Sequence, residues 1–138
     1  LYYLDSFVPW MDKVPFLPRA TVAWVTSEAT VLDQAKVLQR PIFVDFSAKW
    51  CAPCEEMNRT TFRDPRVIEK LATEWVAWKV DATFTTPDIE KILDRYRVLG
   101  WPTMIFLDMN GQEIPKSRRV GEVLSAEQLL QILDQLRK

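Results

Sequence analysis

Two cysteines, Cys51 and Cys54, are the residues whose type and spacing could most clearly do chemistry. They are the only cysteines among 138 residues, and they lie where an apolar run gives way to a helical pattern. A thiol pair spaced Cys-x-x-Cys at a strand-to-helix junction is typical of a redox site. The sequence therefore predicts thiol–disulfide exchange at this pair.

The expected helix would give the two thiols different roles. A cysteine at a helix N-terminus has a lowered pKa, because unpaired backbone N–H groups and the helix dipole stabilise the thiolate. We therefore expect Cys51 to be the attacking thiolate. Cys54 follows one turn later, within disulfide reach of Cys51, so it can resolve a mixed disulfide formed with a substrate.

An acidic residue, Asp45, interrupts the apolar run 42–46 six residues before Cys51. If this carboxyl group is buried, its pKa is raised, and it could accept the proton of Cys54 during exchange. The alternative is a buried polar group with no chemical role whose hydrogen bonds are satisfied. Because the end of this strand leads to the cysteines, Asp45 can lie beneath the pair, although its carboxyl group could also turn to an edge of the sheet.

Two tryptophans and a proline complete the candidate site. Trp50 precedes the first cysteine, and it either packs at the rim of the site or belongs to the core. Trp101 and Pro102 open the predicted strand 103–107. A proline in that position suggests a cis peptide bond in a tight turn. We predict that Trp50, Trp101 and Pro102 bind the substrate.

Composition excludes several other kinds of function. The chain has no histidine and a net charge of −1, and 48% of its residues are hydrophobic. The lack of histidine removes Ser-His-Asp and Cys-His catalysis, and two cysteines alone do not complete a structural zinc site. With no basic patch, we expect no nucleic-acid partner, and we also expect no metal and no cofactor.

The hydrophobic pattern alternates between strands and helices. Strands are predicted at 21–25, 42–46, 75–81 and 103–107, with an antiparallel partner ending near 119–121. A first helix is predicted at 28–39. A second begins at Cys51, breaks at 60–61 and restarts at 64–65. A third begins at 87, and a last one begins at a capping box at 125–128. Strand–helix alternation predicts parallel pairing, so the fold class is α/β, with a mixed sheet and helices on both faces.

The start of the chain differs from the rest. Residues 1–20 are apolar and rich in proline, which predicts an extended N-terminal segment or linker before a single domain at 21–138. A second interpretation is a tether that leaves a membrane-embedded part. No run approaches the roughly 18 apolar residues of a membrane span.

These motifs resemble the thioredoxin superfamily from about residue 21 to the end. The sequence Trp-Cys-Ala-Pro-Cys at 50–54 is similar to that family's Trp-Cys-Gly-Pro-Cys. Asp45 matches the family's buried acid, and 101–103 matches its cis-proline loop facing the disulfide. The resemblance implies the thioredoxin fold, a central mixed β-sheet flanked by helices, and a redox-active disulfide between Cys51 and Cys54.

Within the superfamily, the segments 60–67, 98–103 and 108–113 resemble the C-terminal periplasmic domain of the DsbD family. The resemblance implies a monomeric domain that is periplasmic and tethered to the inner membrane within a longer chain. It would receive electrons from a membrane donor and pass them to protein thiols and disulfides, including other domains of a DsbD-type protein. That family carries an acid where this chain has Asn58, and Glu55 and Glu56 are the nearby candidates to replace it.

Three alternatives use the same cysteines. The chain could be a freestanding thioredoxin-like periplasmic reductase, because such proteins share most of these motifs. The cysteine pair could instead hold Cu(I), for which two thiolates suffice. A purely structural disulfide is the third alternative, although bridging residues three apart constrains little of the unfolded chain. The sequence does not determine the direction of electron flow.

Overall fold

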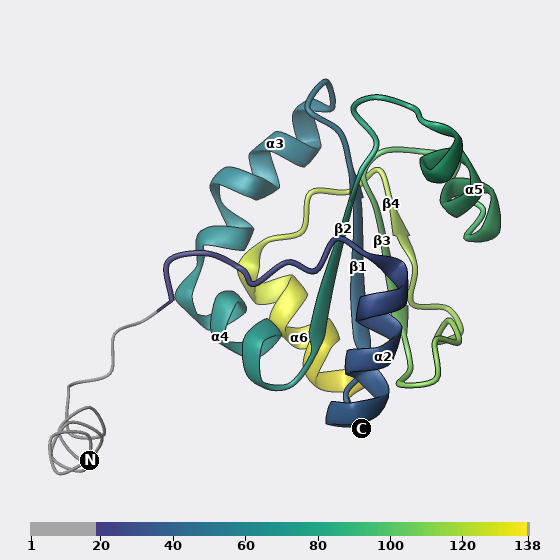
Figure 1. Ribbon diagram of the computed structural model, residues 1–138. Coiled ribbons are helices and arrows are strands. Elements are labelled where there is room, and N and C mark those ends of the chain that lie inside the picture. The colour runs from purple at the N-terminus through teal and green to yellow at the C-terminus, as the bar shows by residue number, and fades with distance from the viewer. Residues whose placement is uncertain (1–18, 138) are drawn as a thin grey trace, which may run out of the picture.

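The computed structural model describes residues 19–137, and most of the predicted segment 1–20 lies outside them (Figure 1). The helices are α2 Glu28–Leu38, α3 Ala52–Arg59, α4 Pro65–Thr73, α5 Pro87–Arg95 and α6 Ala126–Leu136, with a 3-10 turn, η1 Thr61–Arg63, between α3 and α4. The strands are β1 Ile42–Ser47, β2 Val76–Asp81, β3 Thr103–Leu107 and β4 Arg119–Val120. No helix in this part of the chain is both long enough and apolar enough to cross a membrane.

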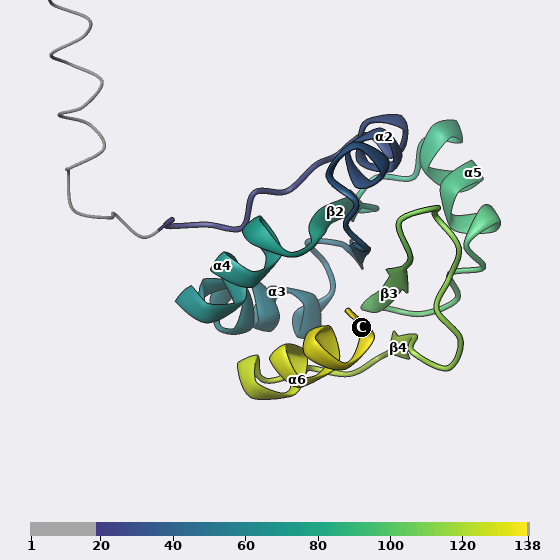
Figure 2. The same ribbon diagram turned by 90° about the horizontal axis from the view of Figure 1, so that it is seen from below.

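The four strands form one mixed sheet with helices on both faces, as predicted. Their order is β2-β1-β3-β4, with β1 and β2 parallel and the other two pairs antiparallel. Buried side chains of α3, α4 and α6 pack on one face. Buried side chains of α2 and half-buried side chains of α5 pack on the other. Figure 2 shows the sheet between these two groups of helices. The fold is therefore a two-sided α/β sandwich around β1.

The central strand β1 contributes to both cores. All six of its residues are buried. Phe43 packs with the core beneath α3, α4 and α6, whereas Val44 and Phe46 pack with the core beneath α2 and α5. Side chains alternate between the two faces of a strand, so a continuous apolar run is what a strand covered on both faces requires.

Local signals fixed the helix boundaries well. Asp64 caps α4 and accepts a hydrogen bond from the backbone N–H of Arg66, and Pro65 opens the helix, as predicted. The Ser125 and Gln128 side chains form the predicted capping box at the start of α6. These contacts involve residues only two or three apart in the chain, which is why the sequence pattern could predict them.

The expected direction of β3 was wrong. Strand–helix alternation predicted parallel pairing, but β3 runs antiparallel to β1, with Phe46 opposite Thr103. The connection from β2 through α5 starts and finishes at the same end of the strands, on opposite sides of β1, so β3 begins beside the end of β1. The antiparallel direction of β3 places the loop before it at the end of the sheet where the cysteines follow β1.

The predicted strand 21–25 was also wrong. A single parallel bridge joins Val25 to Trp78, with hydrogen bonds on either side of it. The backbone N–H of Trp24 donates to the carbonyl of Val22 at 3.0 Å, a short-range turn that interrupts an extended ladder. The Trp24 side chain instead packs edge-on against Phe62. Side-chain packing on the sheet replaces strand pairing here.

Candidate functional site

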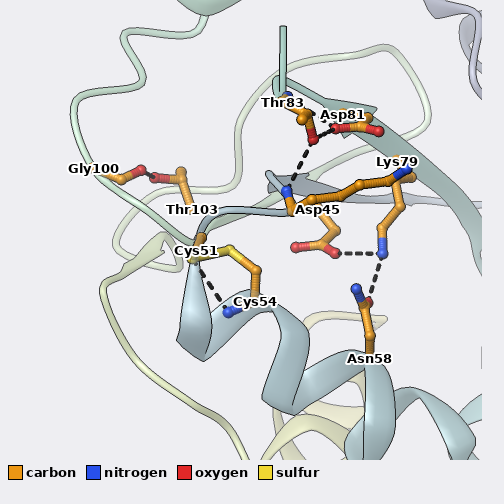
Figure 3. The surroundings of a disulfide bond; sticks show 10 residues. Asp45, Cys51, Cys54, Asn58, Lys79, Asp81, Thr83, Gly100 and Thr103 are labelled. Carbon is orange, nitrogen blue, oxygen red and sulfur yellow. Dashed lines mark hydrogen bonds and ion pairs between the residues drawn. A yellow bond between two sulfur atoms is a disulfide. The ribbon is translucent and has the colours of Figure 1, made fainter.

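The cysteine pair lies at the N-terminus of α3, where β1 delivers it. Cys51 is the N-cap residue, with extended backbone angles, and Cys54 lies in the first turn behind Pro53. A disulfide joins Cys51 to Cys54, with 5.3 Å between their Cα atoms (Figure 3). The sequence predicted both this position and this pairing. The pair fits a Cys-x-x-Cys redox site.

The start of α3 provides one backbone donor to the Cys51 sulfur. The backbone N–H of Cys54 donates to Cys51 Sγ at 3.2 Å. In the reduced protein the same N–H would stabilise a thiolate at Cys51, because a hydrogen bond to the charged form lowers the pKa of the group. Cys51 is only 5% exposed, and Cys54 is buried behind it. Both cysteines are therefore largely enclosed in the disulfide form.

The loop before β3 lies against the cysteine pair. The peptide bond between Trp101 and Pro102 is cis, as predicted. The Thr103 hydroxyl donates to the carbonyl of Gly100 at 2.7 Å, which holds the two ends of the loop together. Trp101 packs against the buried cluster that contains both cysteines. The antiparallel entry of β3 therefore brings Trp101 and Pro102 to the disulfide.

Asp45 is buried within β1, with 2% of its surface exposed. Burial raises the pKa of this carboxyl group above its ordinary value, although the charge of Lys79 partly offsets the effect. The Lys79 Nζ atom lies 3.2 Å from Asp45 Oδ2. Figure 3 shows one carboxylate oxygen directed to Lys79 and the other toward the side of the disulfide. The predicted rise in pKa is confirmed, but the group has an ionic partner.

Lys79 is the residue that sequence reasoning missed. It is the register partner of Asp45 on the neighbouring strand β2, and its ammonium group also donates to Asn58 Oδ1 at 2.8 Å. The same ammonium group lies 4.5 Å from the ring centre of Trp24, a cation–π distance. One signal was available: a lone acid and a lone base interrupt the two apolar runs that form neighbouring parallel strands.

Asn58, and neither of the two glutamates near the pair, accepts the hydrogen bond from Lys79. Glu55 lines the same surface pocket as Asn58 and Lys79, a hollow of about 230 Å³. Glu56 lines a different pocket, toward the start of α6. An amide therefore occupies the position beside Lys79 where the sequence comparison anticipated an acid.

Trp50 lies at the rim of the site and not in the core. Its side chain is 59% exposed, and its ring meets Trp101 edge-on with 5.6 Å between ring centres. The indole N–H donates to the carbonyl of Thr83 at 3.2 Å. The structure thus brings together all six predicted site residues: the disulfide, Asp45 beneath it, and Trp50, Trp101 and Pro102 beside it.

The described residues contain no cluster of three or more Cys, Asp or Glu side chains arranged to hold a metal ion. The two thiols alone could ligate Cu(I), which needs only two soft ligands. Asp45 and the Pro102 loop would have no part in such a site.

The chain belongs to the thioredoxin-like domain family, whose model it matches over residues 29–137. Among solved structures, it is similar to a thioredoxin from Thermus thermophilus, with a TM-score of 0.70, 28% identity, and 84% of this chain and 87% of that one covered. It also matches the oxidised C-terminal domain of DsbD from Neisseria meningitidis, with a TM-score of 0.65, 22% identity, and coverage of 82% and 98%. At that identity, the second likeness shows a shared fold.

Among curated proteins, the chain is similar to those named thiol:disulfide interchange protein DsbD. The protein from Actinobacillus pleuropneumoniae is 38% identical over 97 residues, which cover 70% of this chain and 16% of that protein. The one from Haemophilus ducreyi is 32% identical over 138 residues, covering 93% of this chain and 24% of that protein. The chain therefore spans about a quarter or less of the length of these relatives.

Proposed function

We propose that this chain is a thiol:disulfide oxidoreductase that works as a protein-disulfide reductase. The observation that carries the proposal is the Cys51–Cys54 disulfide at a helix N-terminus, with Asp45 beneath it and the Pro102 loop against it. The similarity to proteins named thiol:disulfide interchange protein supports the same reaction. A structural disulfide would need neither a buried carboxyl group nor an exposed aromatic rim.

Two exchange steps transfer two electrons to the partner protein. In the reduced chain, the Cys51 thiolate attacks one sulfur of a partner disulfide; a mixed disulfide forms, and the partner's other sulfur leaves as a thiolate. The Cys54 thiolate then attacks Cys51 Sγ, which restores the Cys51–Cys54 disulfide and releases the partner's second thiolate. The partner is reduced, and this chain is oxidised.

Asp45 accepts the proton in the second step. Cys54 is buried, so its thiol must lose a proton to a group within the protein before it attacks. Because the pKa of Asp45 is raised, its carboxylate is a stronger base than an ordinary carboxylate, and its basicity is closer to that of a thiolate. Lys79 holds this carboxylate in place from the opposite side. Trp50, Trp101 and Pro102 bind the polypeptide that surrounds the partner's cysteine.

We further propose that the chain is one domain of a longer protein of the DsbD type. In this role residues 21–138 form the redox domain in the periplasm, and residues 1–20 link it to a membrane-embedded donor of electrons. Periplasmic proteins, including other domains of the same protein, are then the electron acceptors. The alternative is a freestanding periplasmic reductase with the same chemistry. The DsbD-named relatives, which are four or more times longer, favour the first arrangement.

Substitution of each cysteine tests the reaction. Reduction of insulin by dithiothreitol should be accelerated by the wild-type chain and not by Cys51→Ala, because the attacking sulfur is lost. Cys54→Ala should accumulate a mixed disulfide with insulin, visible by mass spectrometry without reductant, because nothing resolves it. Catalysis by Cys51→Ala at the wild-type rate would rule out the proposed function.

A further inference from the structure

Thr83, in the loop between β2 and α5, contacts the segment that leads into the cysteine pair. Its carbonyl accepts the indole N–H of Trp50 at 3.2 Å, and its hydroxyl accepts the backbone N–H of Lys49 at 2.9 Å. These partners are adjacent in the chain but more than 30 residues from Thr83. One residue therefore fixes both the backbone and the side chain immediately before Cys51.

Asp81 holds Thr83 in this position. Its Oδ1 atom accepts the backbone N–H of Thr83 at 2.9 Å and also accepts the Thr83 hydroxyl. The hydroxyl thus donates to Asp81 and accepts from Lys49, so both of its hydrogen-bonding roles are used and its orientation is fixed (Figure 3). Partial burial raises the pKa of Asp81, but the hydrogen bonds from Thr83 and the charges of Lys49 and Lys79 outweigh this and lower it overall.

This contact orders a side chain that would otherwise have rotamer freedom. Trp50 is exposed over more than half of its surface, yet its indole is held at one side by Thr83 and at the other by the ring of Trp101. Ordering an exposed side chain before a partner arrives removes part of the entropy cost of binding. A preordered aromatic face beside Cys51 suits a polypeptide that must place its own cysteine there.

We propose that Thr83, held by Asp81, is a positioning residue for partner recognition. It fixes Trp50 in the orientation in which the indole binds the polypeptide around the partner's cysteine. The inference rests on the proposed reductase function and adds a determinant of binding to it. Thr83 does not touch the sulfurs. Its hydroxyl bonds to Asp81 and to the backbone N–H of Lys49, and so holds the Thr83 carbonyl where it accepts the Trp50 indole. Losing the hydroxyl therefore weakens binding of a protein partner and leaves the reactivity of Cys51 intact.

The variant Thr83→Val in the full chain tests this, because valine keeps the shape and removes the hydroxyl. We expect KM for insulin to rise about threefold to tenfold, the range for the entropy cost of ordering one side chain on binding, with kcat little changed. The Trp50 indole N–H resonance, assigned with Trp50→Phe, should shift and exchange faster with water. Alkylation of reduced Cys51 by iodoacetamide should proceed at the wild-type rate, since this small reagent does not need Trp50.

Three controls make the outcome specific. Thr83→Ser keeps the hydroxyl and should restore both KM and the indole resonance. Asp81→Ala removes the carboxylate that orients Thr83, and should reproduce the changes without altering Thr83 itself. Thr85→Val alters an exposed threonine two residues on in the same loop, and should leave both readouts at wild-type values.

Several results would overturn the inference. One is an unchanged indole resonance and an unchanged KM in Thr83→Val. Another is a parallel loss of kcat and of Cys51 alkylation, which would mean that the substitution damages the cysteine site itself. Failure of the wild-type chain to reduce insulin would refute the proposed function instead, whereas the indole resonance reports on the Thr83 contact independently of that activity.

Discussion

At the scale of single residues, the balance between burial and charge at Asp45 dominates the site. The carboxyl group is almost fully enclosed, which disfavours its ionised form, and Lys79 at 3.2 Å only partly compensates. Lys79 also bonds to Asn58 and lies over Trp24, so its ammonium group is shared among several partners. The outcome is a carboxyl group that keeps its proton at a higher pH than an ordinary aspartate does.

The variant Asp45→Asn should therefore be more stable than the wild-type chain near neutral pH. Between the ordinary carboxyl pKa and the raised pKa of Asp45, the native state binds more protons than the unfolded state, so the free energy of unfolding falls as pH rises through that window. Asparagine cannot ionise and avoids this loss. Urea unfolding at about pH 8 should show the variant to be more stable, and the difference should shrink toward about pH 4.

An exposed acid provides the comparison for this experiment. Asp88→Asn, on the surface of α5, should show no pH-dependent gain of this kind. If Asp45→Asn were less stable than the wild-type chain at both pH values, the Lys79 contact would outweigh the burial of the carboxyl group. The assignment of Asp45 as a raised-pKa proton acceptor would then be wrong.

At the scale of elements, α5 is held less firmly than the other helices of the described region. None of its residues is fully buried, and Ile89, Ile92 and Leu93 contact the core only as half-buried side chains. Its C-terminal end is tied to α2 through Glu28, which forms an ion pair with Arg95 and accepts the Tyr96 hydroxyl at 2.8 Å. Helices with few buried side chains open at a lower free-energy cost than core strands do.

Removing this tie should loosen α5 selectively. In Glu28→Ala we expect amide hydrogen exchange of α5 to accelerate by up to about tenfold, which corresponds to about 1.4 kcal/mol, while the amides of β1 exchange at the wild-type rate. Hydrogen exchange followed by NMR measures both in one sample. Glu69→Ala, on α4, removes a surface ion pair with Arg19 and should leave α5 unaffected. Equal acceleration in α5 and β1 would show that Glu28 supports global stability instead.

For the molecule as a whole, the sequence predicted what local contacts determine. Helix boundaries depend on caps such as Ser27, Asp64 and Ser125, whose partners lie within three residues, and the position of Cys51 follows from the same rule. The cysteine pair and the cis-proline loop carry short motifs. Their resemblance to a known family predicted that they face each other.

Features that depend on contacts between distant parts of the chain could not be predicted from the sequence. The direction of β3 depends on the end of the sheet at which the connection through α5 finishes, and no local sequence pattern indicates that end. The Lys79 contact to Asp45 requires knowing that β1 and β2 are in register at these residues. Trp50 lies at the rim and not in the core because its indole binds the carbonyl of Thr83, which is 33 residues away in the chain. In each case a pairing between separate elements decides the outcome.

The exposed apolar side chains are distributed unevenly over the molecule. Trp50 and Phe84 lie at the edge where β1 ends, on either side of the Thr83 contact. Leu99 lies in the loop before the cis-proline, and Val120 lies in β4. Val120 is close to this loop, because its side chain would contact a Cβ atom added at Gly100. Trp50 packs against Trp101, which contacts the cysteine cluster, and Val120 pairs with Thr103 at the start of β3. We refer to Trp50, Phe84, Leu99 and Val120 as the apolar rim. We expect a partner polypeptide that reaches Cys51 to contact this rim.

Leu99 gives the most direct test of the rim, because it is 95% exposed and its replacement disturbs no packing. If a partner covers this side chain, Leu99→Ser should raise KM for insulin about fivefold, since partial burial of a leucine contributes about 1 kcal/mol, and kcat should be unchanged. Val37→Ser is the matched control. Val37 is 74% exposed on α2, near the start of β1 and hence at the opposite end of the strands from the cysteines. Its KM should equal that of the wild-type chain. Equal effects of the two substitutions, or no effect of Leu99→Ser, would mean that partners do not bind across this rim.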